Sequence, residues 1–173
     1  MFEWFRKKPT PSGTSHEKLP EPKDDYDFAI LGDIKRVGWS VIQINPEHPG
    51  TEPFYSFSVG LFHTHKHPEI ILIGLRHEVA GAIINSIGAA VLLGQRMQPG
   101  RTYEEFTSVP VAFVEVDPAY YEEYVGYARW LYRGSNFPML QCVWPLKSGH
   151  FPWDKGYDKA GAAIQPLLAR PRR

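Results

Sequence analysis

The chain has little cysteine and no excess of charge of either sign. Cys142 is its one cysteine among 173 residues, so no disulfide can form within the chain, and a zinc site built from several thiolates is excluded. Lysine plus arginine and aspartate plus glutamate number 19 each. This balance gives no field to attract nucleic acid or an anionic membrane. We therefore expect no nucleic-acid binding and a reducing compartment, the cytoplasm.

Long hydrophobic runs are also missing. The longest candidate, residues 80–93, is interrupted by glycine, asparagine and serine, and falls short of the roughly 20 apolar residues that span a bilayer. The start of the chain, Met1–Lys8, has three aromatic residues but no apolar core followed by a small-residue cleavage site. These absences predict neither a membrane span nor a secretory signal. The role of the aromatic and basic start stays open.

Familiar catalytic signatures are absent from the sequence. It has no G-x-S-x-G elbow, no phosphate-binding loop of the G-x-x-x-x-G-K-[ST] type and no G-x-G-x-x-G fingerprint. Cys142 lies in a predicted strand, where a thiol is usually an inert core group. Whether the protein is an enzyme stays open, and binding is favoured over catalysis.

What the sequence does contain is enough apolar material for one core, with 43% hydrophobic and 14% aromatic residues. Residues 9–23 hold four prolines among polar and charged residues, a composition typical of disorder. We expect a disordered polar tail over residues 1–23, a single α+β domain over residues 24–168, and a frayed basic end over residues 169–173.

Hydrophobic periodicity predicts a mixed or antiparallel sheet of about five strands with two main helices packed on it. A continuous apolar run at residues 69–75 indicates the central strand. Capping residues and helical spacing mark a first helix from Asp24 to Gly38, and Asp117-Pro118 begins another helix that ends near Gly134. The remaining predicted elements are a hairpin of strands 39–44 and 54–60, a long helix over 76–93, strands 111–116 and 139–144, an ordered loop over 145–157, and a weak helix before residue 168.

The most unusual local feature is an alternation of histidines, His63, His65 and His67, followed by Glu69. If this segment is extended, the three imidazoles point to one side and could bind zinc or iron. The alternative is a solvated loop in which one histidine caps a backbone carbonyl. Such a run is less specific than paired C-x-x-C motifs, so our main expectation is no metal and no cofactor.

A second group of candidate residues lies at and after the last predicted strand: Gln141, Trp144, His150, Trp153 and Asp154. A glutamine inside an apolar strand must find hydrogen-bond partners, because an unpaired amide in a core costs about 1 to 3 kcal/mol. Gln141 then either holds the adjoining loop or faces a pocket. In the second case Tyr55 and Ser56 would complete a binding site with aromatic walls.

Several separate motifs resemble one family of bacterial proteins, the domain of unknown function numbered four-two-six-two, over roughly residues 30–168. They are Gly38–Ile42, Tyr55–Leu61, His67–Ile71, Gly74-Leu75, Gln141–Pro145 and Phe151–Asp154. The resemblance implies no established activity. Leu146 departs from the pattern, since an acidic residue commonly follows the Trp-Pro pair in that family.

A shorter stretch, Tyr55 through Leu75, is similar to suppressor-of-fused-like domains. Bacterial members of that group are implied to be immunity proteins that bind and block toxins. We therefore expect a small cytoplasmic partner-binding protein, with a toxin as one possible partner. The alternative is a metal-dependent enzyme or small-molecule binder using His63–Glu69 and Gln141. A third hypothesis is a homo-oligomer that uses the helix edge of Tyr120, Tyr121 and Tyr124, and the oligomeric state stays open.

Overall fold

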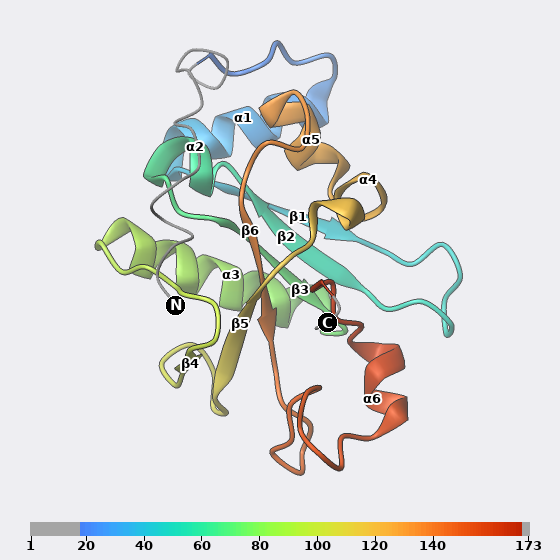
Figure 1. The fold of residues 1–173 in the computed structure, drawn as a ribbon. Helices are drawn as coiled ribbons and strands as arrows, with labels where there is room; N and C mark the ends of the chain where they lie inside the picture. The colour runs from blue at the N-terminus through green and yellow to red at the C-terminus, as the bar shows by residue number, and fades with distance from the viewer. Residues whose placement is uncertain (1–17, 171–173) are drawn as a thin grey trace.

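A six-stranded mixed sheet in the order β1-β2-β3-β6-β5-β4 forms the centre of the structure, a computed structural model that describes residues 18–170 (Figure 1). The strands are β1 (Ser40–Ile44), β2 (Tyr55–Val59), β3 (Glu69–Ile73), β4 (Thr102–Tyr103), β5 (Val111–Glu115) and β6 (Met139–Val143). The helices are α1 (Asp25–Val37), α2 (Leu61–His65), α3 (His77–Leu92), the 3-10 turn η1 (Pro118–Tyr120), α4 (Tyr121–Tyr124), α5 (Gly126–Tyr132) and α6 (Lys159–Ile164). This architecture confirms the predicted single α+β domain.

The strand pairing confirms the predicted hairpin and the predicted central strand. β1 and β2 pair antiparallel from Ser40 opposite Val59 to Ile44 opposite Tyr55. β3 pairs antiparallel with β2 and parallel with β6, and every residue of β3 and β6 is buried. β5 pairs antiparallel with β6 and β4. The two-residue edge strand β4 lies between the predicted elements 76–93 and 111–116, where no strand was predicted.

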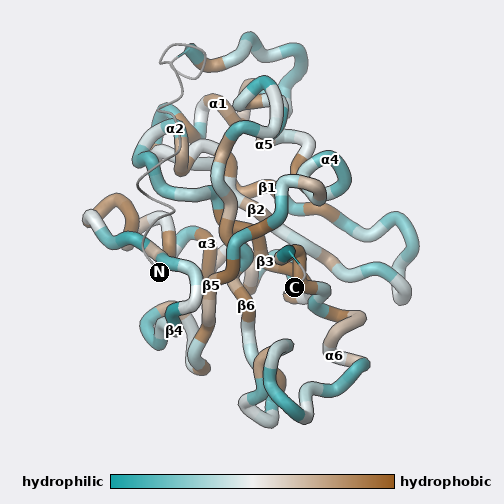
Figure 2. Tube along the Cα trace, in the orientation of Figure 1, coloured by the Kyte–Doolittle hydropathy of each residue, from teal (hydrophilic) through white to brown (hydrophobic). Residues whose placement is uncertain are grey.

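Two apolar layers cover the two faces of the sheet. On one face, Ile71 and Ile73 of β3 belong to a core cluster with α1, α4 and α5. On the other face, Ile70 and Leu72 belong to a cluster with α3. Because successive strand residues point to opposite faces, this double coverage explains why β3 is apolar from Ile70 to Ile73. Figure 2 shows the same distribution, with apolar segments in the central strands and hydrophilic segments in the outer turns.

The first helix begins and ends as its sequence predicted. The Asp24 side chain accepts a hydrogen bond from the Asp27 backbone N–H over 2.8 Å and caps the start of α1. Gly38 ends α1 with φ of 101°, a conformation that favours glycine. The buried residues Ile30, Leu31 and Ile34 lie between these caps. Local capping signals and helical spacing together therefore fix α1.

The helix predicted over 118–134 is broken in the structure. Val125 adopts φ of −129° and ψ of 50°, which separates α4 from α5. The side chain of Val125 is fully buried and Gly126 follows it. A β-branched residue followed by glycine has a weak preference for the helix. Burial of Val125 in the core therefore outweighs the small free energy that a continuous helix would gain at these two residues. The weak C-terminal helix also ends early, at Ile164, and the side chain of Gln165 binds the backbone of Trp144, the residue after β6.

The predicted tail lies mostly outside the described residues, which begin at residue 18. Within it, Leu19 packs against the core cluster of α1 and α5, and the Lys23 backbone N–H donates to Asp27 over 3.0 Å. Over residues 18–170, none of the helices has the length and apolar character needed to cross a bilayer.

Candidate functional site

The histidine-rich segment forms a short helix, so the extended conformation that would point its imidazoles to one side does not occur. Residues Leu61–His65 are α2, which begins after Gly60 with φ of 112° and ends at Lys66 with φ of 55°. Two residues apart on a helix, side chains point in clearly different directions. His63 and His65 are therefore separated, and His67 lies beyond the end of the helix.

Glu69 explains why this segment is helical. Its side chain is fully buried, and one carboxylate oxygen accepts the backbone N–H groups of Gly60 over 2.8 Å and Phe62 over 3.2 Å. The hydroxyl of Tyr132 in α5 donates to the same oxygen, and Ser58 Oγ donates to the other over 2.5 Å. Glu69 thus ties β2, the start of α2 and α5 together. Burial raises the pKa of Glu69, while these four donors act in the opposite direction.

His67 is also fully buried, and both of its ring nitrogens are occupied. Nδ1 lies 2.7 Å from the carbonyl oxygen of Pro68, and Nε2 lies 3.0 Å from the backbone nitrogen of Met97. The Met97 N–H can only donate, so Nε2 is the acceptor and Nδ1 carries the proton of a neutral ring. Burial lowers the pKa of His67 to about 4. The expectation that one histidine caps a backbone carbonyl is met by this residue.

The remaining histidines do not complete a metal site. The ring of His65 lies 6.4 Å from that of Trp39, and its pKa is lowered by burial and by Arg96. The backbone N–H of His63 donates to the Tyr132 hydroxyl over 3.1 Å. In the part of the chain from residue 18 to residue 170, no three His, Cys, Asp or Glu side chains are grouped to hold a metal ion. The zinc or iron alternative therefore finds no ligand set in His63, His65 and His67.

Gln141 has a structural role, although the segment that it holds is the chain after α6 and not the adjoining loop. It lies in β6 and is fully buried. Its Nε2 donates to the carbonyl of Pro166 over 2.9 Å, and its Oε1 accepts the N–H of Leu168 over 2.9 Å. The amide thereby binds the extended chain that follows α6 to the middle of the sheet.

We expect Gln141→Leu to lower the free energy of unfolding by about 2 kcal/mol, because it leaves the backbone groups of Pro166 and Leu168 without partners. Urea unfolding measures this loss, and amide hydrogen exchange at Leu168 should become faster than in the wild type. Gln43→Leu is the matched control, since Gln43 is an exposed glutamine of β1. Equal losses in both variants would contradict a specific role for Gln141.

A second glutamine and Trp144 complete the attachment of the C-terminal segment. Gln165 is fully buried and exchanges two hydrogen bonds with the backbone of Trp144, of 3.0 and 2.9 Å. Trp144 Nε1 donates to the carbonyl of Ile73 over 2.9 Å. The carboxyl ends of the parallel strands β3 and β6 are therefore joined through Trp144. In sheets with parallel strands, ligands commonly bind at this end.

A groove lies at this end of the sheet, and we call it the Trp144 groove. Its volume is about 400 Å³. The lining is mostly apolar, and Lys147 is its one lining residue with a charged side chain. The residues that line it are Val109, Pro110, Trp144, Pro145, Leu146, Lys147, Gly149 and Phe151. Of the residues predicted for a site, Trp144 alone lines this groove.

The loop beside the groove exposes an aromatic pair. The rings of Phe151 and Trp153 stack with centroids 5.0 Å apart and an interplanar angle of 2°. Asp154 accepts the backbone N–H of Phe151 over 2.7 Å, and His150 Nδ1 lies 3.0 Å from Ser148 Oγ. Trp153 remains 43% exposed. The structure thus places Trp153, Asp154 and His150 in one internally bonded loop next to Trp144.

Tyr55 and Ser56 do not join this site, because they lie in β2 and point to opposite faces of the sheet. Ser56 is fully buried, and its Oγ lies 3.1 Å from His77 Nδ1 at the start of α3. His77 Nε2 lies 3.1 Å from Asn45 Oδ1. A buried hydroxyl is not accessible to a substrate, so this Ser-His-Asn series links β2, α3 and the hairpin turn structurally. No sequence spacing marks His77 or Asn45.

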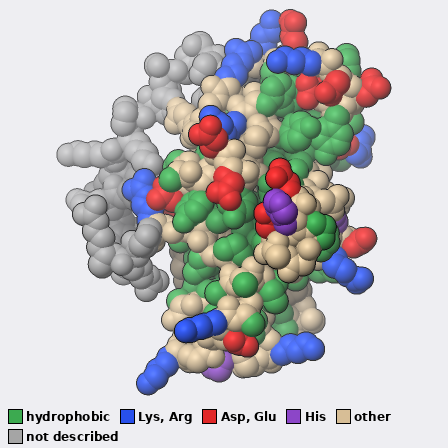
Figure 3. All heavy atoms as spheres, turned by 90° about the vertical axis from the view of Figure 1, so that its right-hand side faces the viewer, with side chains coloured by type: hydrophobic (Ala, Val, Ile, Leu, Met, Phe, Trp, Pro, Cys, Tyr) green, Lys and Arg blue, Asp and Glu red, His purple; other side chains and the backbone are tan. Residues whose placement is uncertain are grey.

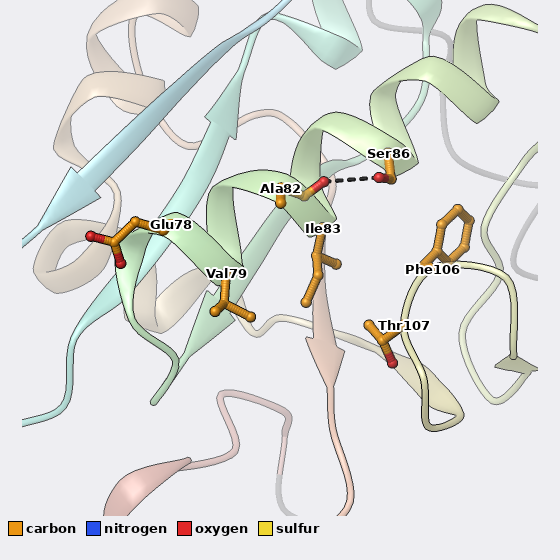
Figure 4. Close-up of a pocket in the computed structure, with 7 residues that line it drawn as sticks. All are labelled: Glu78, Val79, Ala82, Ile83, Ser86, Phe106 and Thr107. Carbon is orange, nitrogen blue, oxygen red and sulfur yellow. Dashed lines mark hydrogen bonds between the residues drawn. The ribbon is translucent and has the colours of Figure 1, made fainter.

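A second groove, of about 410 Å³, lies along the outer side of α3 (Figure 4). The loop of residues 106–110 separates it from the Trp144 groove, since Phe106 and Thr107 line one and Val109 and Pro110 line the other. Ser86 Oγ donates back to the carbonyl of Ala82 within α3, over 2.9 Å. This groove, which the sequence did not indicate, offers few polar groups to a ligand. Its lining consists of Glu78, Val79, Ala82, Ile83, Ser86, Phe106 and Thr107.

Comparison with known families gives a match over residues 33–158, which is most of the chain, to a family described as Domain of unknown function (DUF4262). The chain belongs to the DUF4262 family. Searches of curated proteins and of solved structures returned no match.

The residues matched to DUF4262 include Glu69 with its four hydrogen-bond donors, and they include every residue that lines the Trp144 groove. They also include Cys142, which is fully buried on the α3 side of the sheet, where burial raises the pKa of its thiol. A thiol in this state is a poor nucleophile. In this DUF4262 chain, the buried polar residues of the predicted site support the fold, and His150, Trp153 and Asp154 lie in the loop beside the Trp144 groove.

Proposed function

We propose that the protein binds a protein partner through the Trp144 groove and the adjoining Phe151–Trp153 pair. The observation that carries this proposal is an exposed tryptophan, stacked on a neighbouring phenylalanine, at the edge of an apolar groove. Tryptophan is enriched among the residues that contribute most binding energy at protein interfaces.

The loop is organised for binding before a partner arrives. Asp154 holds the backbone of Phe151, and the Leu146 N–H donates to the carbonyl of His150 over 2.9 Å. A loop that is already ordered loses less conformational entropy on association, so more of the contact energy appears as affinity. Stacking on Phe151 likewise restricts the side chain of Trp153.

The chemistry of the groove indicates what the partner presents. Apolar walls of this volume fit an apolar anchor side chain, and the exposed Lys147 at the groove fits a carboxylate beside that anchor. The likeness of Tyr55 through Leu75 to immunity domains makes a toxin the first class of partner to test.

We expect Trp153→Ala to weaken partner binding by at least tenfold, because truncation of a central interface tryptophan typically costs 2 kcal/mol or more. The experiment is affinity purification from extracts of the native host with wild-type and variant protein, followed by calorimetry with the purified partner. Leu93→Ala is the matched control, because Leu93 is 88% exposed at the end of α3.

A protein recovered with wild type and with Leu93→Ala but lost with Trp153→Ala would support the proposal. Recovery of the same proteins with all three, or of none, would count against it. Thermal unfolding checks that Trp153→Ala is folded.

A further inference from the structure

Five tyrosines from α1, η1, α4, α5 and β2 form two groups of rings, a trio of Tyr55, Tyr120 and Tyr124 and a pair of Tyr26 and Tyr127. The rings of Tyr55 and Tyr124 lie 5.2 Å apart, those of Tyr120 and Tyr124 lie 6.3 Å apart, and those of Tyr26 and Tyr127 lie 5.1 Å apart. All five are partly exposed, and Tyr26 is 47% exposed. We call this set the tyrosine face.

Acidic side chains border the tyrosine face. Glu122 and Glu123 of α4 are exposed, as are Glu47 and Glu52 of the β1–β2 turn. Figure 3 views the molecule from this side and shows hydrophobic and acidic side chains next to each other. We call these four glutamates the acidic rim.

Electrostatic effects on the tyrosines indicate that Glu47, Glu52 and Glu123 of the acidic rim lie close to the rings. Burial raises the pKa of Tyr55 to about 12, with further contributions from Tyr124, Glu123 and Glu47. Burial also raises the pKa of Tyr124, with contributions that include Glu123 and Glu52. The hydroxyl groups of both tyrosines therefore stay protonated at neutral pH, and each ring lies in a negative local field.

One arginine of the chain pairs with a carboxylate at the start of η1, the turn that carries Tyr120. Arg170 pairs with Asp117, at the start of η1, with Nε 3.2 Å from Oδ2. Asp117 also accepts the N–H of Ala119 and so caps the turn that carries Tyr120. This pair shows that a carboxylate close to Tyr120 in the sequence binds a guanidinium group.

We propose that the tyrosine face and its acidic rim bind an arginine-containing segment of a protein partner. Guanidinium planes stack on tyrosine rings and pair with carboxylates through two parallel N–H groups. Lysine offers a point charge without this planar geometry, so arginine is the better ligand. The negative charge of the acidic rim thus favours a partner segment that carries arginine. This surface shares no residue with the Trp144 groove.

Fluorescence anisotropy with a labelled hexa-arginine peptide at low ionic strength tests this proposal. We expect saturable binding that is tighter than for hexalysine. We expect the double variant Glu122→Gln/Glu123→Gln to weaken it about tenfold. Tyr124→Leu should remove the preference for arginine over lysine while leaving the charge of the surface unchanged.

The matched control is Glu78→Gln/Glu104→Gln, which removes two exposed carboxylates elsewhere on the molecule and should leave the affinity unchanged. No saturable binding, or equal weakening by both double variants, would overturn the proposal. If Tyr124→Leu does not fold, the double variants still decide, because all four carboxylates are exposed. Self-association in light scattering that the Glu122/Glu123 variant abolishes would assign the face to a second copy and also overturn it. The assay contains no partner of the Trp144 groove, so its result is independent of the Trp153→Ala experiment.

Discussion

Glu69→Ala is expected to lower the free energy of unfolding by about 3 to 5 kcal/mol, the largest effect of any substitution considered for this protein. The variant removes the acceptor of four hydrogen bonds, which come from Ser58 Oγ, the N–H groups of Gly60 and Phe62, and the Tyr132 hydroxyl. Burying an unsatisfied polar group costs about 1 to 3 kcal/mol, and structural relaxation recovers part of the sum. Urea unfolding followed by tryptophan fluorescence measures the change.

Glu69→Gln separates the effect of shape from the effect of charge. Its carbonyl oxygen can still accept from Gly60, Phe62 and Tyr132, whereas its amide nitrogen replaces the oxygen that faces Ser58. We expect a loss of about 1 to 2 kcal/mol, well below that of the alanine variant. Equal losses in the two variants would contradict the view that hydrogen-bond acceptance is the main role of Glu69.

The difference in unfolding free energy between the wild type and Glu69→Gln should depend on pH, because burial raises the pKa of Glu69. The folded chain retains the carboxyl proton to higher pH than the unfolded chain, whose carboxyl titrates near 4.5. The contribution of the protonated Glu69 carboxyl to the free energy of unfolding is complete below pH 4.5, and it is lost as the pH rises through the folded pKa. The wild type should therefore exceed Glu69→Gln in free energy of unfolding by more at pH 4.5 than at pH 7.

The elements that the sequence predicted correctly depend on local signals. Asp24 and Gly38 mark both ends of α1 because capping requires residues within one turn of the helix. The apolar run that follows Glu69 indicated the central strand, because a strand covered on both faces has no polar side. Their prediction therefore needed no knowledge of the rest of the chain.

The elements and site residues that were predicted incorrectly depend on contacts between distant segments. The helix α2 forms above a carboxylate that the chain supplies from β3, and Tyr132 reaches that carboxylate from 63 residues away. The position of Gln141 in an apolar strand predicted that its amide needs hydrogen-bond partners. The structure identifies these partners as backbone groups of Pro166 and Leu168. The exposed loop of Trp153 was found from composition alone, since an aromatic residue among turn-forming residues has little core to enter.

Between pH 7 and pH 4, His67→Gln is expected to avoid a loss of about 3 kcal/mol in the free energy of unfolding that the wild type undergoes. In the wild type, Nε2 accepts the Met97 N–H, so protonation would place two donors against each other in a site closed to water. The folded pKa is about 4, below the value of 6.5 for an unperturbed histidine. The unfolded chain therefore binds a proton that the folded chain does not.

The sign of the effect follows from this difference. The stability associated with a neutral His67 is complete above pH 6.5 and is lost as the pH falls through about 4. Between pH 7 and pH 4 the wild type should lose about 3 kcal/mol more than His67→Gln, although the variant is less stable at pH 7. Urea unfolding at a series of pH values measures both curves, with the exposed His48→Gln as the matched control. Parallel curves for wild type and His67→Gln would show that His67 accepts a proton in the folded state, and that the Met97 contact does not hold the ring neutral.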